Sequence, residues 1–398
     1  MNKGELVMNN LMQQGCPVLF GCGTVNQIGV EAKKLKITKA LCVYDNTMKN
    51  TGTADRVIGC LTDEGIEVVS FDKVLPDPPE EICDEGAELG RKEKVDGVIA
   101  IGGGSTIDTA KAIDILLTNP GKIDDYFGHP FPSMPPNPIL PLISIPTTSG
   151  TGSEVTFAGV ITSNKAGGKR SVLATGHFAI LDPELTVTAP PSVTAQTGMD
   201  AFCHAAENIT NVRDNPKSTV LASHAVKLLL EWLPVAVKDG KNLEARTQVA
   251  LASNFAGIAI NEGWTSYGHC MAHAMAATVV EAAHGNLCAL AFPVYIKIRA
   301  EECPEKVMIL ADALGLNLDK DVSPRELGEA VSQRVIEFNR EIGVKSLKEM
   351  GVKREDLEGH LEHGQAVLND FNYERYDRNP KPAEFWTDKI VEVFDIYQ

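Results

Sequence analysis

The stretch VIAIGGGSTIDTAKAI, residues 98–113, decides the fold, because it joins an apolar strand to a helix through Gly102, Gly103 and Gly104. We expect Ser105 to open this helix and Asp108 to act as its capping-box partner. Glycines have no side chains, so a pyrophosphate can approach the backbone N–H groups at the helix N-terminus. The stretch predicts a nucleotide-phosphate loop, and a plain strand-to-helix turn is the alternative.

Apolar runs of strand length recur on both sides of this loop. ALCVYD (40–45), EVVSFD (67–72) and PLISIPTT (141–148) are separated by enough chain for helices, which is typical of βαβ units and a parallel sheet. The shorter runs VTFAGVIT (155–162) and HFAILD (177–182) predict a hairpin or edge strands.

The character of the chain changes after Pro190 and Pro191. Ala- and Leu-rich segments with helical spacing follow at 218–233, 246–260 and 269–283. We therefore predict an α/β dinucleotide-binding domain with a parallel sheet over residues 1–185, followed by an all-α metal-binding domain over residues 186–398.

Composition narrows the class of protein. The chain has 398 residues, and its 37 Lys and Arg against 53 Asp and Glu give a net charge of −16, which argues against nucleic acid as a partner. Nine cysteines without a CxxC pair suit a reducing compartment. The N-terminus lacks the apolar core of a signal peptide, and no apolar stretch is long enough to span a bilayer. We expect a soluble cytoplasmic protein.

Two further features of the first half bear on a cofactor. Asp45 ends an apolar strand, where a carboxylate can accept hydrogen bonds from ribose hydroxyls and repel a 2′-phosphate, which favours NAD over NADP. A turn or cap role for Asp45 is the alternative. IPTTSGTGSEVT (145–156) carries five hydroxyl residues from Thr147 to Ser153 at the end of a predicted strand, where α/β proteins bind ligands.

The second half gathers a carboxylate and imidazoles at helical spacing: Asp200, His204, His269, His273 and His284. Residues four apart lie on the same face of a helix, so both can bind one shared metal ion. Gly285 suggests that a helix ends near His284, which could fold back toward the same point. Three imidazoles and one carboxylate suit Fe(II), Zn(II) or Mn(II). The alternatives are a capping-box role for Asp200 opposite Thr197 and core roles for the histidines.

Five motifs occur in one order over nearly the whole chain: GGGSxxDxxK, PTTSGTGSEVT, DPELT, GMDAFCHAAE and GHCMAHAMAA with a later HG. Together they strongly resemble the iron-containing (group III) alcohol dehydrogenase family. The resemblance implies an N-terminal dinucleotide-binding domain, a C-terminal helical domain and an active site in the cleft between them.

The resemblance also implies roles for single residues. The implied metal ligands are Asp200, His204, His269 and His284, with Fe(II) as the leading metal and Zn(II) or Mn(II) as alternatives. His273 matches a histidine near the nicotinamide that relays protons. The implied NAD(H) contacts are Asp45, Gly102, Gly103, Gly104, Ser105, Thr147, Thr148, Thr151 and Lys169.

We therefore expect an NAD-linked alcohol dehydrogenase or aldehyde reductase that acts on a small alcohol or aldehyde as a homodimer or higher homo-oligomer. The competing hypotheses are a dehydroquinate-synthase-like lyase, a zinc-dependent polyol dehydrogenase on the same fold, and a catalytically silent NAD-binding protein. A phosphate-bearing lyase substrate would need basic residues near the metal, and segments 199–211 and 263–292 have no Lys or Arg.

The residues just before His269 bear on the substrate. The rings of Trp264 and Tyr267 are expected to narrow the cleft beside the metal, with Asn261, Thr265, Ser266 and the Tyr267 hydroxyl as polar partners. Such a pocket favours a short aldehyde with a second polar group, such as a hydroxyl or an acid. The alternative is that both rings simply pack the helical domain.

Overall fold

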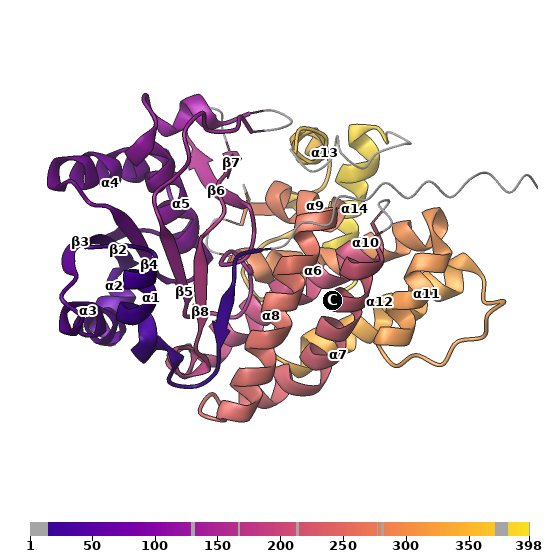
Figure 1. Ribbon diagram of the computed structural model, residues 1–398. Coiled ribbons are helices and arrows are strands. Elements are labelled where there is room, and N and C mark those ends of the chain that lie inside the picture. The colour runs from indigo at the N-terminus through magenta and orange to yellow at the C-terminus, as the bar shows by residue number, and fades with distance from the viewer. Residues whose placement is uncertain are drawn as a thin grey trace, which may run out of the picture.

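The computed structural model describes residues 15–128, 132–165, 168–211, 215–276, 278–279, 282–370 and 381–397. Residues 1–14, on which the signal-peptide expectation rests, lie outside these ranges. Figure 1 shows a sheet with helices on both faces in the N-terminal half and a body of helices in the C-terminal half, side by side. The predicted fold class, an α/β part followed by an all-helical part, is confirmed.

Six parallel strands form the sheet, in the order β1-β8-β5-β4-β2-β3. Their bounds are β1 Val18–Phe20, β2 Lys39–Asp45, β3 Glu67–Val74, β4 Gly97–Gly102, β5 Leu142–Pro146 and β8 Phe178–Leu181. The run at 177–182, expected in a hairpin or at an edge, instead lies inside the sheet, because β1 pairs with its outer side.

Helices cover both faces of this sheet because its strands alternate apolar side chains between two cores. Val98 and Ala100 of β4 face a core shared with α4 and α5, whereas Ile99 and Ile101 face one shared with α1 and α3. The helices of this half are α1 Ile28–Lys34, α2 Asn46–Asn50, α3 Thr53–Asp63, α4 Glu80–Glu93 and α5 Gly104–Thr118.

A separate antiparallel hairpin, β6 Ala158–Ser163 with β7 Gly168–Leu173, packs against α5. The buried ammonium group of Lys111 on α5 holds the segment that leads into it. Lys111 Nζ donates to the backbone oxygens of Ser153, Thr156 and Ala158 at 2.7, 2.9 and 2.7 Å. These bonds tie the hydroxyl-rich segment to the helix that follows the glycine loop.

The helical half surrounds one large core, in which Phe202 packs edge-on against Phe292 at 5.5 Å between ring centroids. Its helices are α6 Pro191–Ile209, α7 Pro216–Lys238, α8 Leu243–Gly263, α9 Tyr267–Ala276, α10 His284–Glu302, α11 Pro304–Ala313, α12 Pro324–Glu341, α13 Leu361–Leu368 and α14 Ala383–Asp395. The helix expected over 269–283 ends early, at Ala276, and His284 starts a new helix instead of ending the old one.

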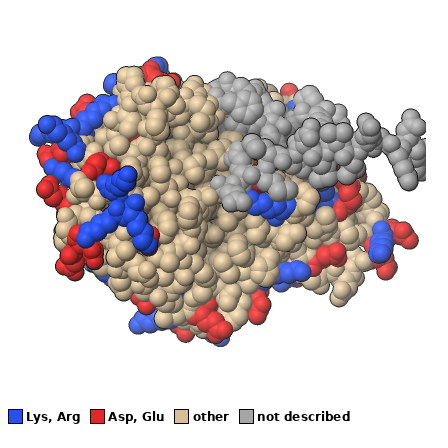
Figure 2. All heavy atoms as spheres, in the orientation of Figure 1, with Lys and Arg blue, Asp and Glu red and all other residues tan. Residues whose placement is uncertain are grey.

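The expectation that no stretch is long enough to span a bilayer is wrong by length and composition, because α7, alone among the described helices, is long and apolar enough. This helix packs against α6 and α8. On the face shown in Figure 2, Lys and Arg side chains are interspersed with Asp and Glu rather than gathered into one basic patch. All nine cysteines are free thiols.

Candidate active site

The glycine loop lies where β4 meets α5 and packs directly against the hydroxyl-rich segment. Thr147 N–H donates to the Gly102 carbonyl at 3.0 Å. A Cβ atom on Gly104 would collide with the Thr151 side chain, and one on Gly103 would lie 3.1 Å from Thr148 Oγ1. The glycine loop and the hydroxyl-rich segment, both predicted to bind the cofactor, therefore form one surface. Their close contact depends on the absence of side chains in the glycine loop.

The helix after the loop begins differently from our expectation. Gly103 is the N-cap of α5 and no side chain caps it, so the capping box of Ser105 and Asp108 is wrong. Asp108 turns inward, where it accepts hydrogen bonds from Ser153 Oγ at 2.5 Å and from Val160 N–H at 3.0 Å. The first turn of α5 thus keeps backbone N–H groups available for an anion.

The sheet order places this loop at a switch point. The chain runs outward from β2 to β3 and then returns to β4 on the other side of β2, so the carboxyl ends of β2 and β4 flank a crevice. Asp45 lies at the end of β2 beside the glycine loop. It also caps α2, since its Oδ1 accepts the Met48 N–H at 2.9 Å.

Three histidine side chains of the helical half converge on one carboxylate oxygen, that of Asp200. Asp200 Oδ1 lies 3.6 Å from the Nε2 atoms of His204, His269 and His284 alike. Asp200 and His204 come from α6, His269 from α9, and His284 from the first residue of α10. Thr197, the capping alternative for Asp200, lies inside α6 and donates its hydroxyl to Val193.

These donors fit a divalent metal ion. Asp200 Oδ1 and His269 Nε2 are buried and have no hydrogen-bond partner among the described residues, which is costly for polar atoms unless a ligand satisfies them. A tetrahedral ion with bonds of about 2.1 to 2.2 Å separates its ligand atoms by about 3.5 Å. The observed spacing of 3.6 Å matches that separation.

The charge states of three of the four groups also fit metal binding. Burial opposes ionisation of Asp200, but the neighbouring histidines, His204 first, more than offset it and hold the pKa of its carboxyl well below the usual range. Burial lowers the pKa of His204, and burial followed by Lys169 lowers the pKa of His284. An ionised carboxylate beside neutral imidazoles is the form that coordinates a metal. Burial acts to lower the pKa of His269, but Cys288 and Glu207 outweigh it and raise that pKa well above its usual value, so this ring would have to give up its proton when an ion binds.

Two carboxylates, the buried Glu207 and the half-buried Asp370, orient histidines of the site, and the sequence analysis missed both. Glu207 Oε1 lies 2.8 Å from His269 Nδ1, which leaves the opposite ring nitrogen facing Asp200. Asp370 Oδ2 lies 2.6 Å from His273 Nδ1. Glu207 follows Asp200 by seven residues on one helix face, a signal that could have revealed it. Asp370 is 97 residues from His273 and gave no such signal.

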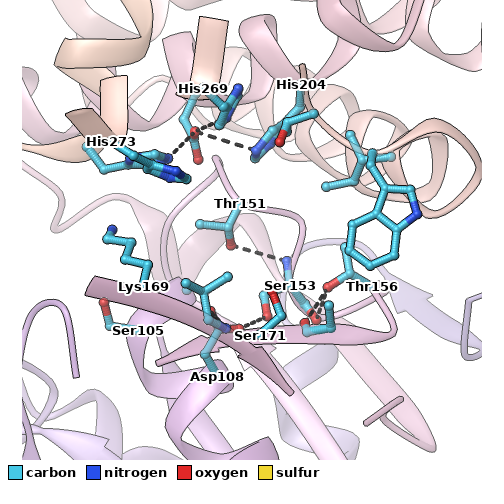
Figure 3. A pocket seen from close by; sticks show the side chains of 18 of the residues that line it. Ser105, Asp108, Thr151, Ser153, Thr156, Lys169, Ser171, His204, His269 and His273 are labelled. Atoms are coloured by element: carbon cyan, nitrogen blue, oxygen red, sulfur yellow. Dashed lines mark hydrogen bonds and ion pairs between the residues drawn. The ribbon is translucent and has the colours of Figure 1, made fainter. Parts of the chain in front are cut away.

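A cavity of about 220 Å³ connects the two halves of the site. Figure 3 shows His204, His269 and His273 along one wall and Ser105, Asp108 and Ser171 along the other, with Lys169 reaching toward the histidines. Lys169 comes from β7 and forms an ion pair with Asp77 at 2.8 Å. His273 lines the cavity, but no ion pair joins it to Asp200 among those of the described residues.

The two aromatic residues expected in the pocket lie in different places. Trp264 lines the cavity, and its ring meets Phe157 edge-on at 5.0 Å. Tyr267 is buried in the helical core against Trp386, at 5.1 Å between ring centroids, and does not line the cavity. The expectation that Tyr267 narrows the cleft is therefore wrong, because its side of α9 faces α14.

The expected polar partners of the substrate are also fewer. Asn261 uses its side chain to hold Val155 O at 2.8 Å and Phe157 N–H at 3.1 Å, although it borders the cavity. Ser266 is buried away from the cavity, whereas Thr265 lines it.

The backbone of Trp264 has φ 65° and ψ −176°, a region that side-chain-bearing residues rarely adopt and that costs about 1 to 3 kcal/mol.

Comparisons with known proteins agree with this geometry. The family model for iron-containing alcohol dehydrogenases matches residues 17–183, and the C-terminal model of the Fe-containing alcohol dehydrogenase family matches residues 194–395. An NAD-dependent methanol dehydrogenase of Bacillus methanolicus is 35% identical over 344 residues, covering 85% of this chain and 89% of the relative. A sulfoacetaldehyde reductase of Bilophila wadsworthia is 35% identical over 386 residues, covering 95% and 96%.

A solved structure shares the whole architecture. The alcohol dehydrogenase from Oenococcus oeni superposes with a TM-score of 0.89 at 32% identity, covering 98% of this chain and 100% of that one. The chain belongs to the iron-containing alcohol dehydrogenase family. It is a metal-dependent alcohol dehydrogenase or aldehyde reductase, an oxidoreductase acting on CH–OH groups, and its family implies NAD(H) and a divalent metal.

Proposed function

We propose that this enzyme interconverts a short, polar-substituted alcohol and its aldehyde, using NAD(H) and one Fe(II) ion. The ion would be held by Asp200, His204, His269 and His284. One observation carries the proposal: three imidazole nitrogens lie 3.6 Å from one buried carboxylate oxygen, in the wall of the cavity that the glycine loop also lines. Three nitrogens and an oxygen are a donor set that Fe(II) accepts.

The N-terminal half would hold the cofactor. The backbone N–H groups of the loop Gly102–Gly104 and of Ser105 would receive the pyrophosphate at the start of α5. Thr147, Thr148 and Thr151, which pack on that loop, would line the path toward the nicotinamide. Lys169 would reach the ribose from the hairpin, and Asp45 at the end of β2 would favour NAD over NADP.

The helical half would position the substrate oxygen and its proton. A bound divalent ion polarises a carbonyl, or makes an alcohol easier to deprotonate, and the nicotinamide accepts or supplies the hydride. Glu207 fixes the ring of His269 through Nδ1. His273, whose Nδ1 is engaged by Asp370 at 2.6 Å, would exchange a proton with the substrate oxygen through Nε2.

The walls of the cavity favour a small, polar substrate. Trp264, Phe157 and Ile260 supply an apolar side, whereas Thr265 and Lys169 supply polar groups. The nicotinamide and the substrate would share the cavity of about 220 Å³, which would favour a short substrate. The relative that covers 95% of the chain is named for a short aldehyde with an acidic group, sulfoacetaldehyde.

A paired substrate comparison tests the proposal. The ratio of kcat/KM for a two- to four-carbon hydroxy- or carboxy-aldehyde to that for hexanal should exceed one in the wild type and fall in Trp264→Ala. The matched control is Trp232→Ala, because Trp232 packs against the helical core and does not line the cavity. A wild-type preference for hexanal, or equal ratios in wild type and Trp264→Ala, would contradict the proposal.

We also propose a cytoplasmic homodimer or higher homo-oligomer. The free thiols suit a reducing compartment. Light scattering of the purified enzyme gives the mass directly, and a single mass near 43 kDa would contradict the oligomer.

A further inference from the structure

One hydroxyl group in the wall of the active-site cavity has no role in the function proposed so far. Ser171 lies on β7, is 3% exposed and lines the cavity. Its Oγ atom is buried and has no hydrogen-bond partner among the described residues. A buried hydroxyl without a partner costs free energy, so a polar group of a ligand in the cavity would stabilise it.

Three other hydroxyls that line the same cavity already have partners within the protein. Ser153 Oγ donates to Asp108 Oδ1 at 2.5 Å, and Thr156 Oγ1 donates to the Ala158 carbonyl at 3.1 Å. Thr151 Oγ1 accepts the Ser153 N–H at 3.1 Å. The chain thus engages these three hydroxyls itself, and the hydroxyl on β7 differs from them.

The position of Ser171 points to the cofactor. In the hairpin Ser171 pairs with Val160, whose N–H donates to Asp108 Oδ2 at 3.0 Å. Asp108 follows Ser105 by one turn of α5, the helix whose first turn would receive the pyrophosphate. Figure 3 shows Ser171 on this wall, with the histidines on the wall opposite. A dinucleotide that runs from the helix to the metal site would bring its nicotinamide between the two walls.

A buried hydroxyl without a partner is not by itself a sign of a ligand, and the chain offers a comparison. Ser144 on β5 is fully buried, and its Oγ also has no partner among the described residues. Ser144 does not line the cavity, whereas Ser171 does. The pocket residues assigned to the substrate, Trp264 and Thr265, come from the helical half, so the substrate is the less favoured partner for a hydroxyl on the sheet side.

We propose that Ser171 Oγ hydrogen-bonds the carboxamide of the nicotinamide and thereby orients the ring for hydride transfer. The inference rests on the proposed function, which assigns NAD(H) to this cavity. A carboxamide has both a donor and an acceptor, and a serine hydroxyl can pair with either. Holding the carboxamide limits rotation of the ring about its bond to the ribose, so one face of the ring is presented to the substrate. Ser171 itself gains and loses no proton in the reaction.

Binding of NADH and of ADP-ribose, which lacks the nicotinamide, tests the proposal without any measurement of activity. Titration calorimetry of the metal-loaded enzyme would compare wild type, Ser171→Ala and the control Ser144→Ala. Ser171→Ala should bind NADH about five- to tenfold more weakly and ADP-ribose as tightly as wild type does. Ser144→Ala should bind both ligands as wild type does. Equal losses for the two ligands in Ser171→Ala, or no loss for NADH, would overturn the proposal.

Thermal unfolding distinguishes a cofactor contact from a structural role. Without cofactor, Ser171→Ala should be at least as stable as wild type, because the hydroxyl that it removes has no partner among the described residues. NADH should then raise its melting temperature less than it raises that of wild type. A less stable cofactor-free variant with an unchanged rise on adding NADH would overturn the proposal.

Two further outcomes have separate meanings. Unchanged NADH affinity in Ser171→Ala, together with a lower kcat/KM for a hydroxy-aldehyde relative to hexanal, would assign the hydroxyl to the substrate and overturn the proposal. Failure of the wild type to bind either NADH or ADP-ribose would instead overturn the proposed cofactor site itself.

Discussion

The two walls of the active-site cavity are completed in different ways. On the sheet side, the charged groups nearest the glycine loop find partners within the protein: Lys111 donates to three backbone oxygens, and both oxygens of Asp108 accept hydrogen bonds. On the helical side, Asp200 Oδ1 and His269 Nε2 have none among the described residues. The charged groups of the first wall are satisfied without a ligand, although Ser171 Oγ there has no partner among the described residues, whereas the charged groups of the second wall are arranged for an ion.

Removing one metal ligand should produce the largest effect and leave the other wall intact. We expect His204→Ala to lose the bound divalent ion. Its turnover should fall by more than the roughly 10- to 100-fold that follows the loss of a residue hydrogen-bonded to a metal ligand. NADH binding, measured by fluorescence, should stay close to wild type because the glycine loop lies on the sheet side. The control is His224→Ala, because His224 lies on α7, where its ring packs beside Phe255 of α8. Stoichiometric metal in His204→Ala would refute the site.

Breaking the sheet-side wall should have the opposite signature. Lys111→Met leaves three buried backbone oxygens without their donor, so the free energy of unfolding should fall by about 3 kcal/mol. Metal content should not change, because the ligands lie in the helical half. Lys122→Met, at a lysine whose side chain is 77% exposed, is the control for urea denaturation. Equal stability of the two variants would show that Lys111 does not hold this wall.

His273 separates a proton-transfer role from a ligand role. His273→Ala should retain the metal while kcat falls about 100-fold and its dependence on pH changes. Asp370→Asn should cause a smaller loss of the same kind, because Asp370 acts only by positioning the ring through Nδ1. Loss of metal from His273→Ala would make this histidine a ligand.

Replacing Glu207 tests how far metal binding depends on the buried carboxylate that holds His269 in place. Glu207→Gln weakens the hold on His269 Nδ1, so affinity for the divalent ion should fall about tenfold, as measured against a chelator. Glu262→Gln is the matched control, since Glu262 is also a buried carboxylate but does not contact a ligand of the site. An affinity equal to that of the control would limit Glu207 to a packing role.

Asp45 should give the smallest effect. Asp45→Gly should raise the ratio of NADP-linked to NAD-linked kcat/KM several-fold, because a repelling charge is lost from the end of β2. Asp45→Asn keeps an acceptor for the Met48 N–H and removes only the charge, so it should shift the ratio in the same direction. An unchanged ratio in both variants would leave Asp45 as a helix cap alone.

Local patterns predicted the fold and the position of most site residues. The four-residue spacing of Asp200 and His204, and the strand–glycine–helix stretch at 98–113, depend on near neighbours in sequence, and the structure has both. The errors concern long-range packing. Asp108 pairs with Ser153 instead of capping its own helix, and Tyr267 turns toward α14, contacts that no local pattern encodes. The place of β8 inside the sheet depends on β1, far away along the chain.

The backbone of Trp264 has a consequence for anyone who wishes to engineer this enzyme. Glycine normally destabilises a folded chain relative to alanine, since its unfolded state is more flexible. At a φ of 65° and a ψ of −176° the order should reverse, because every residue with a Cβ bears the same strain there and glycine does not. Of the replacements that would widen the cavity, glycine would therefore sacrifice the least stability, so a search for variants that combine a broader substrate range with retained stability should arrive at Trp264→Gly.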